Sequence, residues 1–314
     1  MMNLKSRRVL ITGAGHGLGL ATARAFAKEG AFVIITDRDP ERVTEAVCEL
    51  QIQALPCAGY VMDVTDAADV RYVRDQIHAD HGLIHVLINN AGIVTGGQFL
   101  DVPLEKHMVT YDVNTHGPVI VTHLFLQDLL DSDEGHVVNI ASASALIALP
   151  NAATYASSKW AVLGFTDSLR EELELTGRGH VGVSAICPSY INTGMFEGAR
   201  APLLTPILTP ENLASKIVRC VYKKRDHLLT PGLVRLIPLG KATWPRVIFR
   251  RLLQFLGVYQ GMEDWKGHKA AFAEPPKKDE YIRVAGGAPP RTEHFCRFLK
   301  CFKGGAFTSA VQRS

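Results

Sequence analysis

The sequence predicts an α/β fold in which helices cover both faces of a doubly wound, parallel, seven-stranded sheet. Short apolar, β-branched runs alternate with longer segments of helical period from residue 8 to about residue 230. The connections between these segments are short, which forces right-handed crossovers between parallel strands. Hydrophobic residues make up 47% and charged residues 21% of the 314 residues, a globular composition that excludes wholesale disorder.

The strands are expected where β-branched and apolar residues run together, at residues 8–12, 31–36, 58–62, 85–89, 136–141, 181–186 and 227–230. Helices are expected between them, at residues 17–29, 40–50, 66–81, 104–131, 153–176 and 210–224. Thr65-Asp66 and Thr209-Pro210-Glu211 are start signals for two of these helices. In such a sheet, ligands bind at the carboxyl ends of the strands.

After residue 230 the alternation stops. Residues 241–261 predict an amphipathic basic helix, because apolar residues recur at three- and four-residue steps while Arg246 and Arg250 fall opposite. This helix could pack on the body, form a lid over a lipophilic substrate, or contact an anionic membrane. We therefore expect an α/β domain at 1–235, a helical extension at 236–265 and a loosely structured basic tail at 266–314.

The charge is unevenly distributed: residues 1–240 hold 25 acidic and 20 basic residues, whereas residues 241–314 hold 14 basic and 6 acidic. The basic excess lies in a tail without a groove-reading motif, which disfavours a nucleic-acid partner. The six cysteines have no metal-ligand spacing, so we expect free thiols and no metal site. No apolar stretch approaches the roughly 18 to 20 residues that span a bilayer, and no signal peptide is apparent, so a cytoplasmic location is expected.

A glycine-rich turn, TGAGHGLG at residues 12–19, follows the first predicted strand. Glycines let the backbone turn sharply and approach a ligand closely, and the helix N-terminus that follows offers free N–H groups to a pyrophosphate. This strand, turn and helix are the context of a Rossmann-type dinucleotide site, with a tight structural turn as the alternative. The residues expected to hold the dinucleotide here are Gly13, Gly15, His16, Gly17, Leu18 and Gly19.

Asp37 ends the second strand, eighteen residues after Gly19. A carboxylate there can accept hydrogen bonds from both ribose hydroxyls of an adenosine and would repel a 2′-phosphate, which favours NAD over NADP. Arg38 and His16 leave NADP as the alternative, because either could pair with a phosphate. Asp37 could also serve only to open the turn that follows it.

Tyr155 and Lys159 are spaced i and i+4, so one helix face carries a phenol and an ammonium. A tyrosine of pKa about 10 is a poor base at neutral pH, and a nearby positive charge favours the phenolate. Taken alone, such a pair more often lies on a solvated helix surface. Ser142, however, lies thirteen residues before Tyr155 at the end of the fifth strand, so the three side chains could converge at one edge of the sheet.

Together these motifs resemble the short-chain dehydrogenase/reductase family over roughly residues 5–235. The resemblance rests on six motifs in the family's order, which contain residues 12–19, Asp63-Val64-Thr65, residues 89–92 (NNAG), Asn114, Ser142, and Tyr155 with Lys159. It implies that Ser142 bonds the substrate oxygen, with Ser144 as a helper, and that Tyr155 exchanges its proton. Lys159 would bind the nicotinamide ribose and keep Tyr155 acidic, and Asn114 would hold a water in the proton path.

The resemblance also implies cofactor contacts beyond the glycine turn. Asp63 and Val64 would contact the adenine, and the main chain of Ile191 and the hydroxyl of Thr193 would serve the carboxamide and the pyrophosphate. Ser189 stands where the family commonly has glycine. The further cofactor-binding residues are Asn90, Ala91, Gly92 and Pro188, together with Tyr155 and Lys159.

Residues 193–196 (TGMF) resemble the branch of the family that includes retinol, hydroxysteroid and long-chain alcohol dehydrogenases. This resemblance implies an NAD-dependent oxidoreductase acting on an alcohol or carbonyl of a lipophilic steroid, retinoid, fatty alcohol or acyloin. An NADPH-dependent carbonyl reductase and a non-catalytic nucleotide-binding scaffold are the alternatives. The long predicted helices resemble those through which family members associate, which implies a homo-oligomer.

Overall fold

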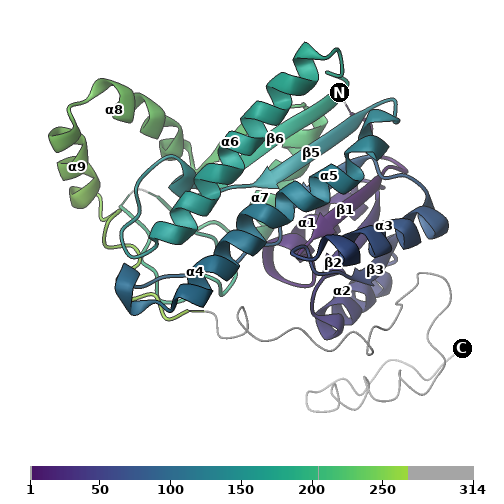
Figure 1. Ribbon diagram of the computed structural model, residues 1–314, viewed down its shortest axis with the longest axis horizontal. Helices are drawn as coiled ribbons and strands as arrows, with labels where there is room; N and C mark the ends of the chain where they lie inside the picture. Colours follow the sequence, from purple (N-terminus) through teal and green to yellow (C-terminus); the bar gives the residue numbers. More distant parts are fainter. Residues whose placement is uncertain (1, 204, 268–314) are drawn as a thin grey trace, which may run out of the picture. The chain divides into compact units, whose positions relative to one another are not determined.

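The sheet has seven parallel strands in the order β3-β2-β1-β4-β5-β6-β7 (Figure 1). This computed structural model describes residues 2–203 and 205–267. The strands are β1 (Arg8–Thr12), β2 (Phe32–Asp37), β3 (Cys57–Val61), β4 (Val86–Asn89), β5 (Gly135–Ile140), β6 (Val181–Pro188) and β7 (His227–Thr230). The predicted doubly wound fold is therefore confirmed. The strand order reverses between β1 and β4, which is where open α/β sheets bind ligands.

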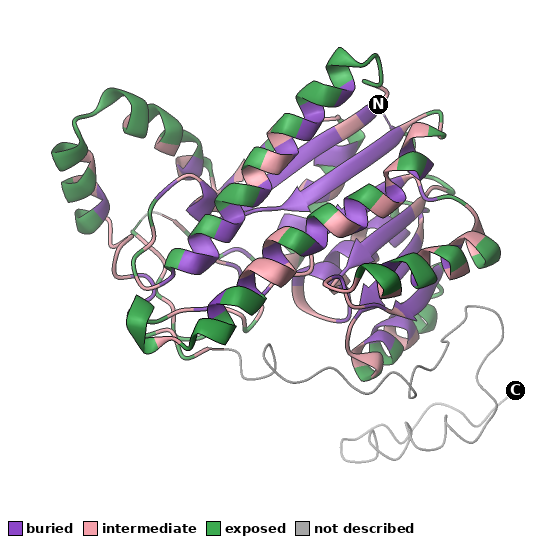
Figure 2. Ribbon diagram, in the orientation of Figure 1, coloured by how far each residue is buried: buried purple, intermediate pink, exposed green. Residues whose placement is uncertain are grey.

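The strands are buried on both faces, because helices cover each side (Figure 2). Side chains alternate along β1, so Val9 and Ile11 join one apolar layer while Leu10 joins the other. The first layer includes α1 (Gly17–Lys28), α2 (Pro40–Ile52) and α7 (Pro210–Tyr222). The second includes α3 (Ala67–His81), α5 (Gly117–Leu130) and α6 (Ala153–Leu175).

Side-chain caps set the starts of three helices. The carboxylates of Asp39 and Asp66 accept hydrogen bonds from main-chain N–H groups in the first turns of α2 and α3, and the hydroxyl of Thr209 does so for α7. The start signals predicted at residues 65–66 and 209–211 are thereby confirmed. Proline follows directly at the first position of α2 and of α7, where its missing N–H costs nothing.

The helix predicted over residues 104–131 is interrupted. It consists of α4 (Leu104–Tyr111), a π-helical turn (Asp112–His116) and α5. Pro118 has no N–H to offer the carbonyl of Asn114, which breaks the regular hydrogen-bond ladder at this point. The extra residue of a π-turn accommodates such a break, and π-turns occur often at functional sites.

The single helix predicted over residues 241–261 is wrong in its extent. The structure has two short helices, α8 (Ile237–Thr243) and α9 (Arg246–Phe255), divided at Trp244 and Pro245. A proline disfavours helical backbone in the residue before it, and Trp244 is extended, with φ −97° and ψ 142°. The loosely structured tail predicted at residues 266–314 lies outside the described residues beyond residue 267. Among the described residues, no helix is long and apolar enough to cross a bilayer.

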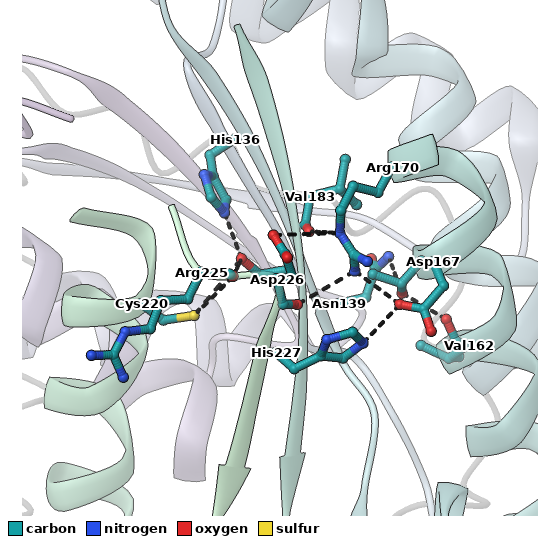
Figure 3. A network of polar contacts seen from close by, with 12 residues as sticks. His136, Asn139, Val162, Asp167, Arg170, Val183, Cys220, Arg225, Asp226 and His227 are labelled. Carbon is teal, nitrogen blue, oxygen red and sulfur yellow. Dashed lines mark hydrogen bonds and ion pairs between the residues drawn. The ribbon is translucent and has the colours of Figure 1, made fainter. Parts of the chain in front are cut away.

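A network of polar contacts joins β7 to the rest of the sheet (Figure 3). It lies toward the amino ends of the strands, away from the carboxyl ends where ligands bind. Arg170 of α6 donates a hydrogen bond to the carbonyl of Val183 at 2.9 Å, and its neighbour Asp167 pairs with His227 at 2.8 Å. His136 is fully buried, and its Nε2 lies 2.7 Å from the hydroxyl of Ser184. Because the Ser184 hydroxyl itself donates to the carbonyl of Arg225, His136 is the donor in its bond with Ser184.

Candidate active site

A cavity of about 620 Å³ lies at the carboxyl ends of the strands, around the reversal point of the sheet. Its lining comes from the segments that follow each of the seven strands. Predicted site residues that line it are Gly13, His16, Gly17, Leu18, Gly19, Asp37, Arg38, Asp63, Val64, Asn90, Ala91, Gly92, Ser142, Tyr155, Lys159, Pro188, Ile191 and Thr193. Gly15 and Asn114 do not line the cavity; they form hydrogen bonds to the lining residues Asp37 and Ile93.

The glycines of the first turn are required by conformation and by close packing. Gly13 and Gly17 have positive φ angles of +61° and +57°, which side chains rarely adopt. A Cβ at Gly13 would lie 2.7 Å from the Cα of Ala91, and one at Gly19 would collide with the Gly13 carbonyl and the Asn90 amide. The turn is thus a tightly built structure whose inner surface faces the cavity.

The helix that follows this turn begins without a side-chain cap. His16 occupies the capping position of α1 and makes no capping hydrogen bond, in contrast to the carboxylates that cap α2 and α3. Gly17, Leu18 and Gly19, in the first turn of α1, line the cavity. The N–H groups and the positive dipole end at this helix start suit an anion such as a diphosphate.

Thr12 and Asn90 hold the glycine turn against the end of β4. The Thr12 hydroxyl accepts hydrogen bonds from the main-chain N–H groups of Asn90 and Ala91, both at 3.0 Å. The Asn90 amide donates to the carbonyls of Thr12 and Gly13, both at 2.9 Å. Sequence reasoning did not assign a role to Thr12, although its place between β1 and Gly13 was the available signal.

Asp37 presents a buried carboxylate to the cavity at the end of β2. It is 7% exposed, and its two carboxylate oxygens accept hydrogen bonds from the main-chain N–H groups of Gly15 at 3.1 Å and Asp39 at 3.2 Å. Burial raises the pKa of Asp37, but hydrogen bonds from His16 and these N–H groups outweigh burial and hold the pKa below its usual value. The carboxylate is therefore charged at neutral pH.

Two arginines also line this end of the cavity. Arg38 was predicted, whereas Arg42 was missed. Arg42 lies in the first turn of α2, where its guanidinium is 3.3 Å from the His16 ring and 3.2 Å from Asp39. Its position three residues after the capping Asp39 could have indicated that it faces the end of β2.

Ser142, Tyr155 and Lys159 come together in the cavity lining. Ser142 follows β5, and its hydroxyl accepts a hydrogen bond from the N–H of Ser144 at 3.1 Å. Tyr155 and Lys159 lie in the first two turns of α6, with the Lys159 ammonium 6.0 Å from the centre of the phenol ring. The ammonium donates a hydrogen bond to the carbonyl of Ile140 at 2.9 Å.

Burial dominates the acid–base properties of this group. It raises the pKa of Tyr155 to about 12, and a hydrogen bond with Ser142 opposes the rise. It lowers the pKa of Lys159 to about 8. The chain's own groups therefore favour a neutral phenol, although Lys159 was expected to keep Tyr155 acidic.

Asn114 lies in the π-turn, fully buried behind the cavity wall. Its amide oxygen accepts a hydrogen bond from the N–H of Ile93 at 2.8 Å, and its amide nitrogen donates to the Ile93 carbonyl and to the Ser158 hydroxyl. A Cβ at Gly92 would be 3.3 Å from the Asn114 oxygen and 3.4 Å from the Lys159 nitrogen. A glycine at residue 92 thus allows Asn114 and Lys159 to approach each other.

The part of the cavity beyond Tyr155 is mostly apolar. Phe196 packs edge-on against the rings of Tyr155 and Tyr190, with ring centres 6.0 and 5.3 Å apart. The indole N–H of Trp265 donates to the carbonyl of Met195 at 3.1 Å and fastens this segment. The apolar lining comes from two stretches, with Met195, Phe196 and Leu203 in the first and Leu233, Val234, Ile237, Leu253, Leu256 and Val258 in the second.

Two buried hydroxyls in this lining lack a hydrogen-bond partner within the described chain: those of Ser144 and Tyr190. An unpaired buried hydroxyl costs free energy, so such groups call for an explanation.

Ser189 stands in the place where glycine was expected. It has no positive φ angle, and β6 runs without interruption to Pro188.

Comparisons with known proteins give a consistent result. The family model described as "short chain dehydrogenase" matches residues 7–203. Epidermal retinol dehydrogenase 2 of Mus musculus is 34% identical over 270 residues, which are 85% of this chain and 87% of that protein. Retinol dehydrogenase 10-B of Danio rerio is 30% identical over 274 residues, or 79% of this chain and 81% of that protein.

Solved structures of similar fold carry different bound molecules. A short chain dehydrogenase/reductase from Burkholderia phymatum in complex with NAD matches 77% of this chain and 95% of its own, with a TM-score of 0.71 and 25% identity. A gluconate 5-dehydrogenase from Burkholderia cenocepacia J2315 in complex with NADP and tartrate matches 74% of this chain and 97% of its own, with a TM-score of 0.67 and 24% identity.

Proposed function

This chain belongs to the short-chain dehydrogenase family, and we propose that it is an NAD-dependent oxidoreductase that interconverts an alcohol and a carbonyl on a lipophilic substrate. The observation that carries the proposal is the position of Ser142, Tyr155 and Lys159 in the cavity. They share this cavity with a glycine turn suited to a diphosphate and with apolar side chains, of which Phe196 packs against Tyr155. A phenol, a hydroxyl and an ammonium in one cavity are the groups needed to exchange a proton with an alcohol oxygen.

The residues present fit a dinucleotide cofactor. The turn at Gly13 and Gly19 leaves no room for side chains, and α1 begins without a side-chain cap, so a diphosphate has main-chain N–H groups to bind. Asp37, charged at neutral pH, can accept hydrogen bonds from ribose hydroxyls and repels a phosphate, which supports NAD. The Burkholderia phymatum relative, whose structure contains NAD, supports the same choice.

Each catalytic side chain has a distinct task. Bound nicotinamide would supply the hydride acceptor or donor. Ser142 holds the substrate oxygen, and Tyr155 removes its proton in oxidation and returns it in reduction. The Lys159 ammonium is fixed by the Ile140 carbonyl and can bind a ribose hydroxyl, while Asn114 orders the chain behind it through Ile93.

An apolar substrate is supported by the lining beyond Tyr155. A long hydrocarbon placed there gains about 0.8 kcal/mol for each buried methylene. The retinol dehydrogenases among the relatives, at 34% and 30% identity, support a retinoid or another lipophilic alcohol. Steroids, fatty alcohols and acyloins have the same combination of one reacting oxygen and an apolar body.

An NADPH-dependent carbonyl reductase is a second candidate, which the positions of Arg38 and Arg42 favour. Both side chains line the cavity next to Asp37, where the 2′-phosphate of NADP would lie. The structure of the Burkholderia cenocepacia relative contains NADP. The charged Asp37, which lines the same part of the cavity as these arginines, would repel the 2′-phosphate and weighs against this candidate.

The proposal is tested by following NADH formation with a panel of retinol, a steroid alcohol, a long-chain alcohol and an acyloin. Calorimetric titration of NAD and NADP against the same protein measures cofactor binding independently of turnover. Turnover of at least one lipophilic alcohol with NAD supports the proposal. NAD binding without turnover of any member of the panel would contradict the substrate class, and preferential binding of NADP would favour the second candidate.

A further inference from the structure

Large apolar side chains are exposed on the segment that follows β7. We call residues 236–256 the C-terminal arm; it contains α8, the Trp244-Pro245 break and α9. Figure 2 shows most of α8 and α9 as exposed, and Figure 1 shows them apart from the helices that cover the sheet. The exposed large apolar residues of the arm are Leu236, Leu239, Trp244, Val247, Ile248 and Phe255, of which Phe255 is 76% exposed.

The arm is also strongly basic. The arm contains four arginine and lysine residues, Lys241, Arg246, Arg250 and Arg251, and no aspartate or glutamate. Arg246, Arg250 and Arg251 lie on α9 and have no ion-pair partner among the described residues. The exposed surface of the arm thus combines hydrocarbon with positive charge that no described residue pairs.

The two properties are arranged around α9. Ile248, Leu252 and Phe255 follow one another at four- and three-residue steps, which places them on one side of the helix. Arg246 and Arg250 are spaced i and i+4 on another side. Leu253 and Leu256 line the cavity, so the apolar stripe of α9 is wider than the cavity contact requires.

Besides the contact of Leu253 and Leu256 with the cavity, the arm contacts α6 through Lys241. The ammonium of Lys241 on α8 lies 4.0 Å from the ring centre of Trp160, and the Trp160 indole donates a hydrogen bond to the carbonyl of Ser144. Lys241 therefore serves this contact, which leaves the three arginines of α9 as the charges that face outward.

We propose that the C-terminal arm docks the protein on an anionic lipid bilayer. Trp244, Ile248 and Phe255 would enter the headgroup region, and the arginines of α9 would lie among the lipid phosphates. A symmetric contact with a second copy of the chain fits less well, because it would bring the basic arms together without acidic residues between them. A bilayer supplies both hydrocarbon and negative charge.

Docking in this way would hold the cavity close to the membrane, since α9 contributes Leu253 to the cavity lining and Phe255 to the docking face. A lipophilic substrate would then have a short path from the bilayer to the cavity. This consequence rests on the proposed function, whereas docking itself does not.

Docking is tested by sedimenting the full chain with vesicles of phosphatidylcholine alone or mixed with phosphatidylglycerol. We expect binding to the anionic vesicles and little to the neutral ones. The variant Arg246→Gln/Arg250→Gln/Arg251→Gln should bind anionic vesicles roughly a hundredfold more weakly, because each basic residue near such a surface contributes a factor of several. The variant Ile248→Ser/Phe255→Ser should lose binding at least as strongly.

Matched controls use exposed residues away from the arm. Ile52→Ser/Leu175→Ser removes two large apolar side chains that are 78% and 87% exposed, and Arg71→Gln removes an exposed arginine of α3. Both should bind vesicles as the wild type does. Quenching of tryptophan fluorescence by brominated lipids should fall in Trp244→Phe, which locates the contact at the arm. Circular dichroism of each variant separates loss of docking from loss of folding.

Specific results would overturn the proposal. These are wild-type protein that does not sediment with anionic vesicles, or arm variants that bind them as well as the wild type. A dimer in lipid-free solution that Ile248→Ser/Phe255→Ser converts to a monomer would instead make the arm a subunit contact. Vesicle binding by a protein that turns over no lipophilic alcohol would leave docking intact and contradict only the proposed substrate.

Discussion

The ammonium of Lys159 donates a hydrogen bond to the carbonyl of Ile140, 2.9 Å away, at the last residue of β5. This bond joins α6 to the central sheet directly beside Tyr155. Lys159 is 5% exposed, and burial lowers its pKa to about 8. The fold thus keeps a cation in a place where a neutral side chain would be more stable.

Lys159→Met should therefore abolish turnover and yet raise the free energy of unfolding by about 2 kcal/mol near neutral pH. The gain is the cost of burying the ammonium minus about 1 kcal/mol for the lost hydrogen bond to Ile140. Between the folded pKa of about 8 and the ordinary value of 10.5, the unfolded wild type binds more protons than the folded one. Wild-type stability should rise with pH across this window, so the advantage of the variant should shrink.

Urea unfolding of both proteins near pH 7 and near pH 10 measures this difference. Lys28→Met, at an exposed position of α1, is the control and should change stability little at either pH. A Lys159→Met protein that is less stable than the wild type near neutral pH would show that the bond to Ile140 outweighs the burial cost.

Tyr155→Phe should lower kcat by about a thousandfold, because it removes the group that exchanges the substrate proton. Cofactor affinity, measured by calorimetry, should change little, since the aromatic ring at residue 155 and the Lys159 ammonium remain. Tyr72→Phe is a matched control, because Tyr72 is an exposed residue of α3 whose hydroxyl accepts a hydrogen bond from Gln76. Substantial residual turnover in Tyr155→Phe would remove the phenol from the proposed mechanism.

Alcohol oxidation should accelerate as pH rises. Burial raises the pKa of Tyr155 to about 12, so below that value the phenolate fraction grows about tenfold per pH unit. The hydrogen bond with Ser142 lowers this pKa, and Ser142→Ala should shift the ascending limb of the profile to higher pH. The measurement is kcat/KM for oxidation against pH in both proteins. A profile that is flat from pH 6 to pH 9 would mean that bound ligands shift the phenol far below the value the chain imposes.

Asp37→Ala should relax cofactor choice. The ratio of kcat/KM for NAD to that for NADP should fall at least about tenfold, because the charge that repels the 2′-phosphate is lost while Arg38 and Arg42 remain. Asp66→Ala is the control. It removes the cap of α3, which should cost about 1 kcal/mol of stability without changing the preference. An unchanged ratio in Asp37→Ala would mean that Asp37 does not select the cofactor.

Ser144→Ala and Tyr190→Phe should each stabilise the free protein, by up to about 1 kcal/mol, because each removes a buried hydroxyl without a partner within the described chain. If these hydroxyls bond a second polar group of the substrate, KM should rise about tenfold in the same variants. Thermal unfolding and steady-state kinetics measure the two effects separately. Unchanged KM would limit these hydroxyls to a structural role.

Much of the fold follows from local patterns in the sequence. The buried strands were predictable from continuous runs of β-branched residues. Asp66 and Thr209 indicated two helix starts, because their side chains can accept hydrogen bonds from main-chain N–H groups, as they do in the structure. The convergence of Ser142 and Tyr155 was predictable because strand ends and following helix starts share one edge of a parallel sheet.

Other features depend on contacts between distant segments. Neither the bond from Lys159 to Ile140 nor the burial that raises the pKa of Tyr155 is visible in a motif, because both depend on how α6 packs on β5. The break at Pro245 could have been predicted from local chemistry, since proline cannot continue a regular helix. It was not predicted because apolar residues recur at helical spacing on both sides of it. The orientation of α9, with Leu253 toward the cavity and Phe255 toward solvent, required the structure.

The π-turn at residues 112–116 also constrains how this chain can change in length. The turn holds one residue more than a regular helical turn, so deleting a residue there would close it into regular helix and move Asn114 away from Ile93 and Ser158. Inserting a residue into α5 would instead rotate the rest of that helix by about 100° and take Phe125 and Leu129 out of the layer they share with α3. Insertions and deletions should be tolerated in surface loops of this protein but eliminated here, even though the segment reads as an ordinary helix.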